Sequence, residues 1–316
     1  MENFRLKVFR TVAEESSFRR AAERLHLSQP AVSQQIHALE EELSTTLFDR
    51  GKARIRLTGA GSVLLRYARK GARLADEARA ALDNLRGETT GTLRIGASMT
   101  VTQYILPRML GAFLQQHPRI EPAVTSGNTE HIVEALAAQK IDLGLIEGPV
   151  SSREVFRQRF FEDRLVLIVG RRYPWPEKSG PAKPGSAKLG PARPTIPVRA
   201  LTEVPLLMRE RGSGSRRVVE LALRRAGLRL SDLRIAMDLD SIVAIISAVE
   251  AGLGAGFVSE WAIQKELRLG TVRVIPVEGL EMRRDMHLIR PFGPIPEGPP
   301  GAFERFILAE APRASH

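Results

Sequence analysis

The sequence contains no cysteine and no long apolar segment. The absence of cysteine excludes disulfide bonds, iron–sulfur clusters and thiolate-bound zinc. The longest purely apolar run, IVAIISAV at 242–249, is far shorter than the roughly 20 residues that a membrane-spanning helix needs. The opening residues, MENFRLKVFR, lack the apolar core of a signal peptide. We therefore expect a cytoplasmic protein with no membrane segment.

Motifs that carry catalysis are missing as well. The six histidines show no spacing typical of a metal site, and no HExxH sequence or Asp-rich loop occurs. Neither the dinucleotide-binding GxGxxG sequence after a strand nor a Walker-type phosphate loop is present. The segment GSGSR at 212–216 is similar to a nucleophile loop, but no histidine and acid stand out as its partners. We predict that the protein is not an enzyme and holds no metal or cofactor.

What the chain does contain is an ordinary globular composition with a basic excess. Its 316 residues, of which 43% are hydrophobic, suit two or more domains. The formal net charge is +11, and it is concentrated in two segments. Residues 1–87 hold 16 basic against 11 acidic residues, and residues 171–199 hold 7 against 1. Local positive charge favours a polyanionic partner, although on charge alone a merely soluble surface remains equally open.

The N-terminal segment predicts short helices followed by a hairpin. Apolar residues at Val32, Ile36, Leu39 and Leu43 form one stripe of a helix that Ser28 caps. Two shorter helices precede this one, and the segment LFDRGKARIRLT at 47–58 has a turn between two short strands. Three helices and a hairpin within about 58 residues indicate a small DNA-binding module.

The outward face of that third helix carries amides, hydroxyls and a histidine but no acid before Glu40. A recognition helix places its N-terminal residues against base edges, where glutamine and serine can form hydrogen bonds and a carboxylate would repel phosphates. An ordinary solvated face is the alternative interpretation. The basic hairpin that follows favours the DNA-reading one.

Residues 58–87 predict one long helix. Small and apolar residues recur in a heptad pattern, at Leu64, Ala68, Gly71, Ala75, Ala78, Leu82 and Leu85. Such a seam suits pairing with a second copy of the chain, while packing of the helix on its own domain is the alternative.

From Gly91 onward, strands alternate with helices, as in two α/β lobes with largely parallel strands. We assign lobe I to about 91–163 and 268–316, and lobe II to about 164–267. Residues 174–197 hold 7 of the 20 prolines and little apolar surface, so we predict a flexible insertion there. Its basic charge either contacts DNA or has no partner.

The stretch FRTVAEESSFRRAAERLHLSQPAVSQQIHALEEELSTTLFDR, followed by RIRLTGAG, closely resembles the N-terminal signature of LysR-type transcriptional regulators. The resemblance is dense over residues 1–62, and the rest of the chain fits the family's linker helix and periplasmic-binding-protein-like effector domain. It implies an operator DNA, RNA polymerase and further copies of the chain, as a homodimer through the linker helix and a homotetramer, as partners. It assigns DNA contacts to Gln29, Pro30, Ala31, Ser33, Gln34 and His37 on the helix and to Arg50 and Arg54 on the wing. The chain departs from the family pattern at Ser16 and Ser44, where glycine is usual, and at Gly59, where proline is usual.

A small anion is the expected effector. Three segments, at 96–100, 126–131 and 209–217, each join a strand to a helix N-terminus with hydroxyl residues, and helix N-termini attract anions. If the fold brings them together at the interlobe cleft, as in the family, the candidate contacts are Ser98, Thr100, Asn128, Thr129, Ser213 and Ser215. Helix capping alone would explain any single one of them. The segment RERGSGSR resembles that of members associated with sulfur-oxyanion or carbon-fixation control.

The sequence thus predicts an α/β protein with three parts: a winged helix-turn-helix domain at 1–58, a linker helix at 59–88 and a two-lobed effector domain at 91–316. The expected function is a sequence-specific transcriptional regulator controlled by an anion bound between the lobes. A small-anion-binding protein or a nonspecific DNA-binding protein without regulatory action is the alternative.

Overall fold

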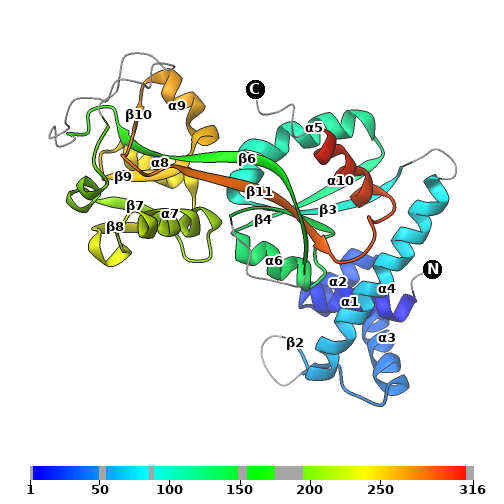
Figure 1. Cartoon of the computed structure of the whole chain (residues 1–316). Coiled ribbons are helices and arrows are strands. Elements are labelled where there is room, and N and C mark those ends of the chain that lie inside the picture. Colours follow the sequence, from blue (N-terminus) through cyan, green and yellow to red (C-terminus); the bar gives the residue numbers. More distant parts are fainter. Residues whose placement is uncertain (1–2, 50–54, 85–88, 149–154, 175–194, 311–316) are drawn as a thin grey trace.

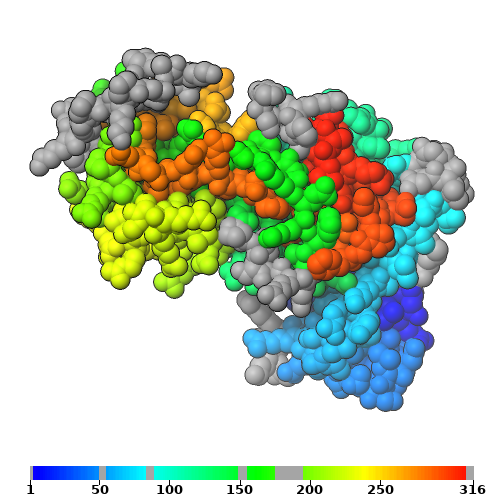
Figure 2. Space-filling view, in the orientation of Figure 1, coloured from blue at the N-terminus to red at the C-terminus, as the bar shows by residue number. Residues whose placement is uncertain are grey.

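The computed structural model describes residues 3–49, 55–84, 89–148, 155–174 and 195–310. Figure 1 shows a small helical domain, a long helix and two α/β lobes, which confirms the predicted architecture. The space-filling view in Figure 2 shows the helical domain protruding below one lobe, away from the other. Most of the predicted insertion, at 175–194, lies outside the described residues.

The N-terminal domain consists of three helices and a two-stranded wing. These are α1 (Phe4–Glu15), α2 (Phe18–Leu25), α3 (Gln29–Glu42), β1 (Phe48–Asp49) and β2 (Arg56–Leu57). Its core is built around Phe9, Ile36 and Phe48, all of which are fully buried. Ser16 and Ser44, which stand where glycine is usual, adopt φ of 48° and 49°. These are left-handed turn positions, which explains the family's preference for glycine there.

The long helix α4 (Gly59–Asn84) joins the helical domain to the lobes. It contacts the helical domain at one end and the first lobe farther along. Leu65 and Ala68 pack in the core of the helical domain. Farther along, the Arg69 guanidinium donates to the Ala138 carbonyl at 2.9 Å, and Arg73 lies 3.2 Å from the carboxylate of Asp142. Burial raises the pKa of Asp142 even though Arg73 opposes this shift. The linker helix is therefore docked on the first lobe.

The first lobe has three parallel strands covered by helices. The strand order is β4 (Ile120–Gly127), β3 (Gly91–Ser98) and β5 (Leu143–Glu147). The helices are α5 (Leu106–Gln116), preceded by a π-helical turn (Val101–Ile105), α6 (Thr129–Ala137) and α10 (Pro299–Glu310). Phe113, Phe303 and Leu145 are among the fully buried residues of its core.

The second lobe repeats this plan. Its parallel strands are β9 (Ala255–Ser259), β7 (Leu206–Arg209) and β8 (Ile235–Leu239), and its helices are α7 (Gly214–Arg225), α8 (Ile242–Glu250) and α9 (Gln264–Leu269). Short 3-10 turns lie at Val198–Glu203, Leu230–Asp232 and Glu260–Ile263. The strand β10 (Val272–Ile275), which we assigned to the first lobe, instead pairs with Leu167–Gly170 of the second. That boundary was wrong because β10 follows β9 without leaving the lobe.

Two long antiparallel strands connect the lobes. β6 (Val155–Gly170) and β11 (Met282–Pro291) run side by side from one lobe into the other, as Figure 1 shows in green and orange. Within their ladder, Arg284 stands directly opposite Asp163. Charged residues interrupt the apolar alternation of both strands where they cross between the lobes, so periodicity alone does not predict their full length. The crossing places charged side chains at the junction.

Candidate DNA-reading face and interlobe site

Local sequence signals fix the start of α3. The Ser28 side chain accepts a hydrogen bond from the Ala31 N–H at 3.3 Å. Pro30 lies in the first turn, where a missing N–H leaves no helical hydrogen bond unmade. The first turn contains no acidic residue. The helix N-terminus is therefore defined and free of the charge that would repel phosphate.

The two faces of α3 differ as predicted, with one exception. Val32, Ile36 and Leu39 are buried in the domain core, but Leu43, the last residue of the predicted stripe, is 42% exposed because the helix ends there. Every candidate reading residue on the helix is at least partly accessible, namely Gln29, Pro30, Ala31, Ser33, Gln34 and His37. Their amide, hydroxyl and imidazole groups can bond base edges without adding negative charge.

The three glutamates at the end of α3 each have a structural partner. The Glu40 carboxylate accepts hydrogen bonds from the N–H groups of Leu47 and Phe48, at 2.8 and 3.3 Å. Glu42 pairs with Arg5 at 2.6 Å, and Glu41 lies 3.3 Å from the His37 ring. Glu40 thus holds the chain that enters the wing. The wing candidates Arg50 and Arg54 lie outside the described residues.

The predicted seam on α4 is only partly available to another chain. Leu64 and Ala68 face the helical domain of the same chain, so those two positions were wrong for a dimer contact. The apolar residues of α4 that are more than half exposed include one residue of the predicted seam, Leu82, and three outside it: Val63, Tyr67 and Leu74. The described part of α4 therefore presents an apolar stripe to its surroundings, shifted from the predicted seam.

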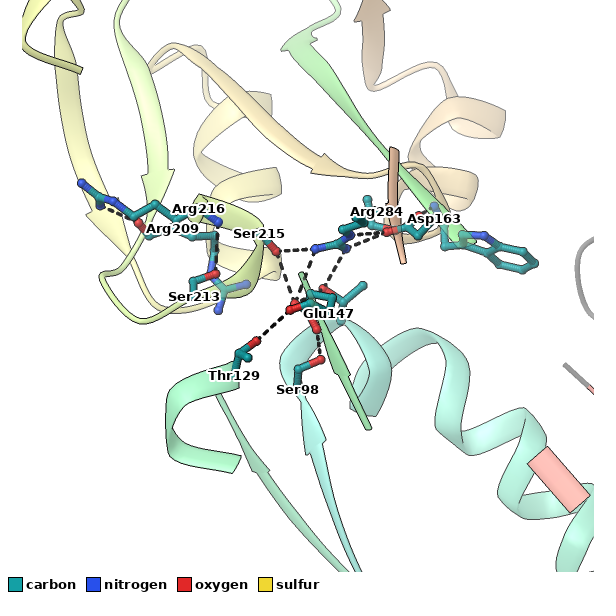
Figure 3. Close-up of polar contacts among 12 residues, drawn as sticks. Ser98, Thr129, Glu147, Asp163, Arg209, Ser213, Ser215, Arg216 and Arg284 are labelled. Atoms are coloured by element: carbon teal, nitrogen blue, oxygen red, sulfur yellow. Dashed lines mark hydrogen bonds and ion pairs between the residues drawn. The ribbon is translucent and has the colours of Figure 1, made fainter. Parts of the chain in front are cut away.

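Hydroxyl residues predicted for the effector site do converge between the lobes. Ser98 ends β3, Thr100 follows it, and Thr129 begins α6, all in the first lobe. Ser215 lies in the first turn of α7, in the second lobe. Figure 3 shows the cluster, and all four side chains are buried.

The carboxylate of Glu147, at the end of β5, lies at the centre of this cluster. It accepts hydrogen bonds from Ser98, from Thr100 at 3.2 Å and from Ser215 at 3.4 Å. Thr129 donates to its main-chain carbonyl at 3.1 Å. Only 2% of Glu147 is exposed. One carboxylate therefore collects hydroxyl donors from both lobes.

An ion pair on the crossing strands completes the cluster. The Nε atom of Arg284 donates to Asp163 at 2.8 Å, and its Nη1 and Nη2 atoms donate to Ser215 and Thr100, at 2.7 and 3.3 Å. Nη1 also lies 3.5 Å from the Glu147 carboxylate. Asp163 accepts a further hydrogen bond from Ser259 at 2.9 Å. Two buried carboxylates thus share one guanidinium.

The other two candidates have capping roles. The Asn128 side chain accepts from the His131 N–H at 2.9 Å, and Ser213 accepts from the Arg216 N–H at 3.4 Å. Gly214, which follows Ser213, lies so close to the end of β5 that a Cβ added to it would be 2.1 Å from the Glu147 carbonyl oxygen. Glycine is therefore needed for α7 to begin against the end of β5.

A cavity of about 710 Å³ adjoins the cluster. It lies between the N-terminal ends of α6 and α7, and Thr129, Ser213 and Gly214 form part of its wall. Basic residues at its rim include Arg211 and Arg217, which are exposed. Burial disfavours the charge of Arg216, but hydrogen bonds to Glu220 and Asp238 outweigh this effect and raise its pKa. Glu130, Glu134 and Glu220 also line the cavity, so its four arginines leave only a small excess of positive charge.

Sequence reasoning missed Glu147, Asp163 and Arg284. A charged residue at the end of an otherwise apolar strand, as in LGLIEG at 143–148, was the available signal, because buried charges are rare without partners.

The described part of the chain contains no group of three or more histidine or acidic side chains suited to a metal ion. Within the same segments, none of the helices combines the length and apolarity that crossing a bilayer requires.

Comparison with known proteins matches both parts of the chain. Residues 4–62 match the family model described as bacterial regulatory helix-turn-helix protein, lysR family, and residues 86–307 match that of the LysR substrate binding domain. A "Probable RuBisCO transcriptional regulator" of Porphyra purpurea is 37% identical, over 90% of this chain and 86% of its own length.

Solved structures agree. Full-length CbnR in complex with its target DNA is 27% identical, with a TM-score of 0.65 and complete coverage of both chains. The CcmR regulatory domain of Synechocystis PCC6803, in complex with 2-PG, is 25% identical, with a TM-score of 0.60, over 70% of this chain and 98% of that one. With both of its domains matched, this chain belongs to the LysR family of helix-turn-helix transcriptional regulators.

Proposed function

We propose that this regulator binds a specific, dyad-symmetric operator as a dimer of dimers, and that a small anion held between the lobes controls it. The observation that carries the proposal is the convergence of Ser98, Thr100, Ser215 and Arg284 from both lobes on one acceptor position. A ligand that gathers donors from both lobes stabilises one interlobe arrangement over others, which is what control by a ligand requires.

DNA reading is assigned to α3. The exposed side chains of Gln29 and Gln34 and the partly accessible Ser33 support this assignment, because they offer hydrogen-bonding groups without charge. Arg50 and Arg54 are proposed to contact the backbone or minor groove from the wing.

Dimerisation is assigned to α4. Its exposed apolar side chains lie together along one face of the helix, and such a patch is typical of a protein interface. A second copy of the chain can cover this face with the same face of its own helix. The same helix contacts the first lobe through Arg69 and Arg73. A change in the arrangement of the lobes can therefore move the helix and the DNA-binding domain attached to it.

The effector is proposed to be a small anion with several acceptor oxygens. Thr129 and Ser213 line the cavity beside the cluster, and the N-termini of α6 and α7, which Asn128 and Ser213 cap, favour negative charge. The buried Nη1 atom of Arg209 has no hydrogen-bond partner among the described residues, and such a donor is often a marker of a functional position.

The regulated genes are proposed to include those for RuBisCO. The relatives named as RuBisCO regulators cover nine tenths of this chain, which supports a similar role. For the same reason 2-PG, the molecule in the CcmR complex, is the first effector to test. RNA polymerase is a further proposed partner, and the cytoplasm, where operator DNA is accessible, is the proposed location.

Selection of binding sites from a random DNA library tests the DNA half of the proposal. We expect enriched sequences to share a dyad-symmetric motif. Enrichment without a common motif would instead support a nonspecific DNA-binding protein.

Thermal unfolding with a panel of anions tests the effector half. A ligand at about 100 times its dissociation constant stabilises the folded protein by roughly 2.7 kcal/mol. The panel consists of 2-PG, inorganic phosphate, sulfate and small carboxylates. If the selected operator is bound but no anion in the panel either raises the unfolding temperature or alters operator binding, the anionic effector is refuted while DNA reading stands.

A further inference from the structure

The carboxylate of Glu147 lies at the centre of the proposed anion site. We propose that Glu147 is a built-in competitor: an effector anion binds by displacing this carboxylate from its donors. The inference rests on the proposed anion site between the lobes and adds the residue that sets its affinity.

The hydrogen bonds around Glu147 are those of a bound anion. Hydroxyl groups of Ser98, Thr100 and Ser215 donate to its two carboxylate oxygens. Two of these hydroxyls in turn accept from the guanidinium of Arg284, so their protons are directed at the carboxylate. An ionised carboxylate only accepts hydrogen bonds, as do the oxygens of phosphate dianion and sulfate. The same donors therefore suit either the side chain or a free anion.

The charge of the cluster requires displacement rather than addition. Glu147 and Asp163 contribute two negative charges and Arg284 one positive charge, and each of these residues is at most 4% exposed. An anion that entered with Glu147 in place would lie beside an incompletely compensated carboxylate. At about 4 Å and an effective dielectric constant of about 20, such repulsion weakens binding on the order of a thousandfold.

The neighbouring cavity lies directly behind the main chain of Glu147. Thr129 and Gly214 line it, and both contact the main-chain carbonyl of Glu147. Arg211 and Arg217 stand at its rim and attract an incoming anion. An anion in the cavity thus lies on the main-chain side of Glu147, and its exchange with the buried carboxylate requires the wall formed by Thr129 and Gly214 to open.

Displacement transfers the interlobe link to the effector. Glu147 belongs to the first lobe and accepts from Ser215 of the second, so its carboxylate ties the lobes together before any ligand binds. The replacing molecule needs at least two acceptor oxygens to reach donors of both lobes. Phosphates, sulfates and carboxylates meet this condition, and chloride does not.

Calorimetric titration of the full-length protein tests the proposal with inorganic phosphate, sulfate and 2-PG as separate probes. In Glu147→Gln the amide nearly preserves the shape of the side chain but removes its charge, so we expect at least a tenfold lower dissociation constant for each probe that binds. Binding to Glu147→Gln alone, with none to the wild type, has the same meaning. Circular dichroism verifies that the variant is folded.

The matched control is Glu134→Gln, which removes a carboxylate that lines the cavity but does not contact the cluster. We expect its dissociation constants to stay within about twofold of the wild type, since exposed charges are screened. If Glu134→Gln gains as much affinity as Glu147→Gln, the effect is general electrostatics and the competitor role is wrong.

Two other outcomes separate the possible failures. Wild-type binding with unchanged or weaker binding by Glu147→Gln overturns the competitor and leaves the anion site intact. No binding by either protein overturns both. Should Glu147→Gln fail to fold, a crystal structure of the wild type with a bound probe decides: the Glu147 carboxylate beyond hydrogen-bond distance of Ser98 supports displacement, and an unchanged contact contradicts it.

Discussion

The outer face of α3 and the interlobe cluster both consist of polar side chains that we propose bind a partner, yet their environments are opposite. On α3, Gln29 and Gln34 are exposed, whereas Ser98, Thr100 and Ser215 in the cluster are buried and already bonded within the protein. A partner of α3 has only water to displace. A ligand of the cluster must break existing hydrogen bonds, which makes its binding a conformational event. The contrast fits the proposal that this regulator reads DNA with a preformed surface and binds its effector by exchange with Glu147.

The largest effect that this comparison predicts is on stability, in the cluster. Arg284→Ala leaves Glu147 and Asp163 buried without their cation, and breaking such a pair costs about 3–5 kcal/mol. Urea unfolding of the purified variant measures this loss.

The adjacent residue is the matched control. Arg283 is 63% exposed and pairs with Glu162 and Glu281, so Arg283→Ala should lower the free energy of unfolding far less than Arg284→Ala does. Similar losses for the two variants would show that burial does not distinguish the cluster from the surface.

The next effect concerns α4, whose apolar stripe lies outside both regions. Leu74 is 67% exposed, and covering a leucine contributes roughly 1.5–3 kcal/mol for each copy. We expect Leu74→Glu to convert dimers to monomers in sedimentation experiments, and Leu74→Ala to weaken the dimer less because it adds no charge. A Leu74→Glu variant that sediments as the wild type does would refute pairing through this stripe.

On the outer face of α3, we expect substitutions to lower the preference for operator over random DNA without changing the stability of the protein. Removing the side chains of Ser33 and Gln34 together loses about 1–3 kcal/mol of discrimination for each base contact. The unfolding free energy should change by less than about 0.5 kcal/mol, because neither side chain is buried. Competition between operator and random DNA measures the first quantity, with Gln35→Ala as the control. Unchanged discrimination would move base reading to another surface.

The smallest effect separates two neighbouring glutamates of α3. Glu40→Ala leaves the N–H groups of Leu47 and Phe48 without their acceptor, which costs about 1–2 kcal/mol of stability and loosens the wing. Glu41→Ala loses only an exposed contact with His37 and should cost under about 0.5 kcal/mol. Chemical denaturation of both variants compares the two, and equal costs would mean that Glu40 does not anchor the wing.

The two regions also differ in how far the sequence predicts them. The stripe of Val32, Ile36 and Leu39 and the cap at Ser28 are local patterns, so the start of α3 and its buried face, apart from Leu43, were predicted correctly. The hydroxyl residues of the cluster were found because each precedes or begins a helix. Their central partners were not found, because the contact between Glu147 and Arg284 depends on how β11 crosses between the lobes. Periodicity along one strand contains no information about such a crossing.

The shift of the stripe on α4 has a similar cause. Leu64 and Ala68 satisfy a heptad pattern, but the helical domain of the same chain packs against them first. A pattern of spacing shows that a face will be covered. It does not show which neighbour covers it.

The most direct test of the account measures operator affinity during titration with 2-PG, in the wild type and in Ser98→Ala. The account predicts that 2-PG changes the operator dissociation constant or footprint of the wild type. Ser98→Ala should bind the operator with similar affinity in the absence of 2-PG and should need a higher concentration to respond. An equal response of the two proteins to 2-PG would contradict the interlobe cluster as the site of control.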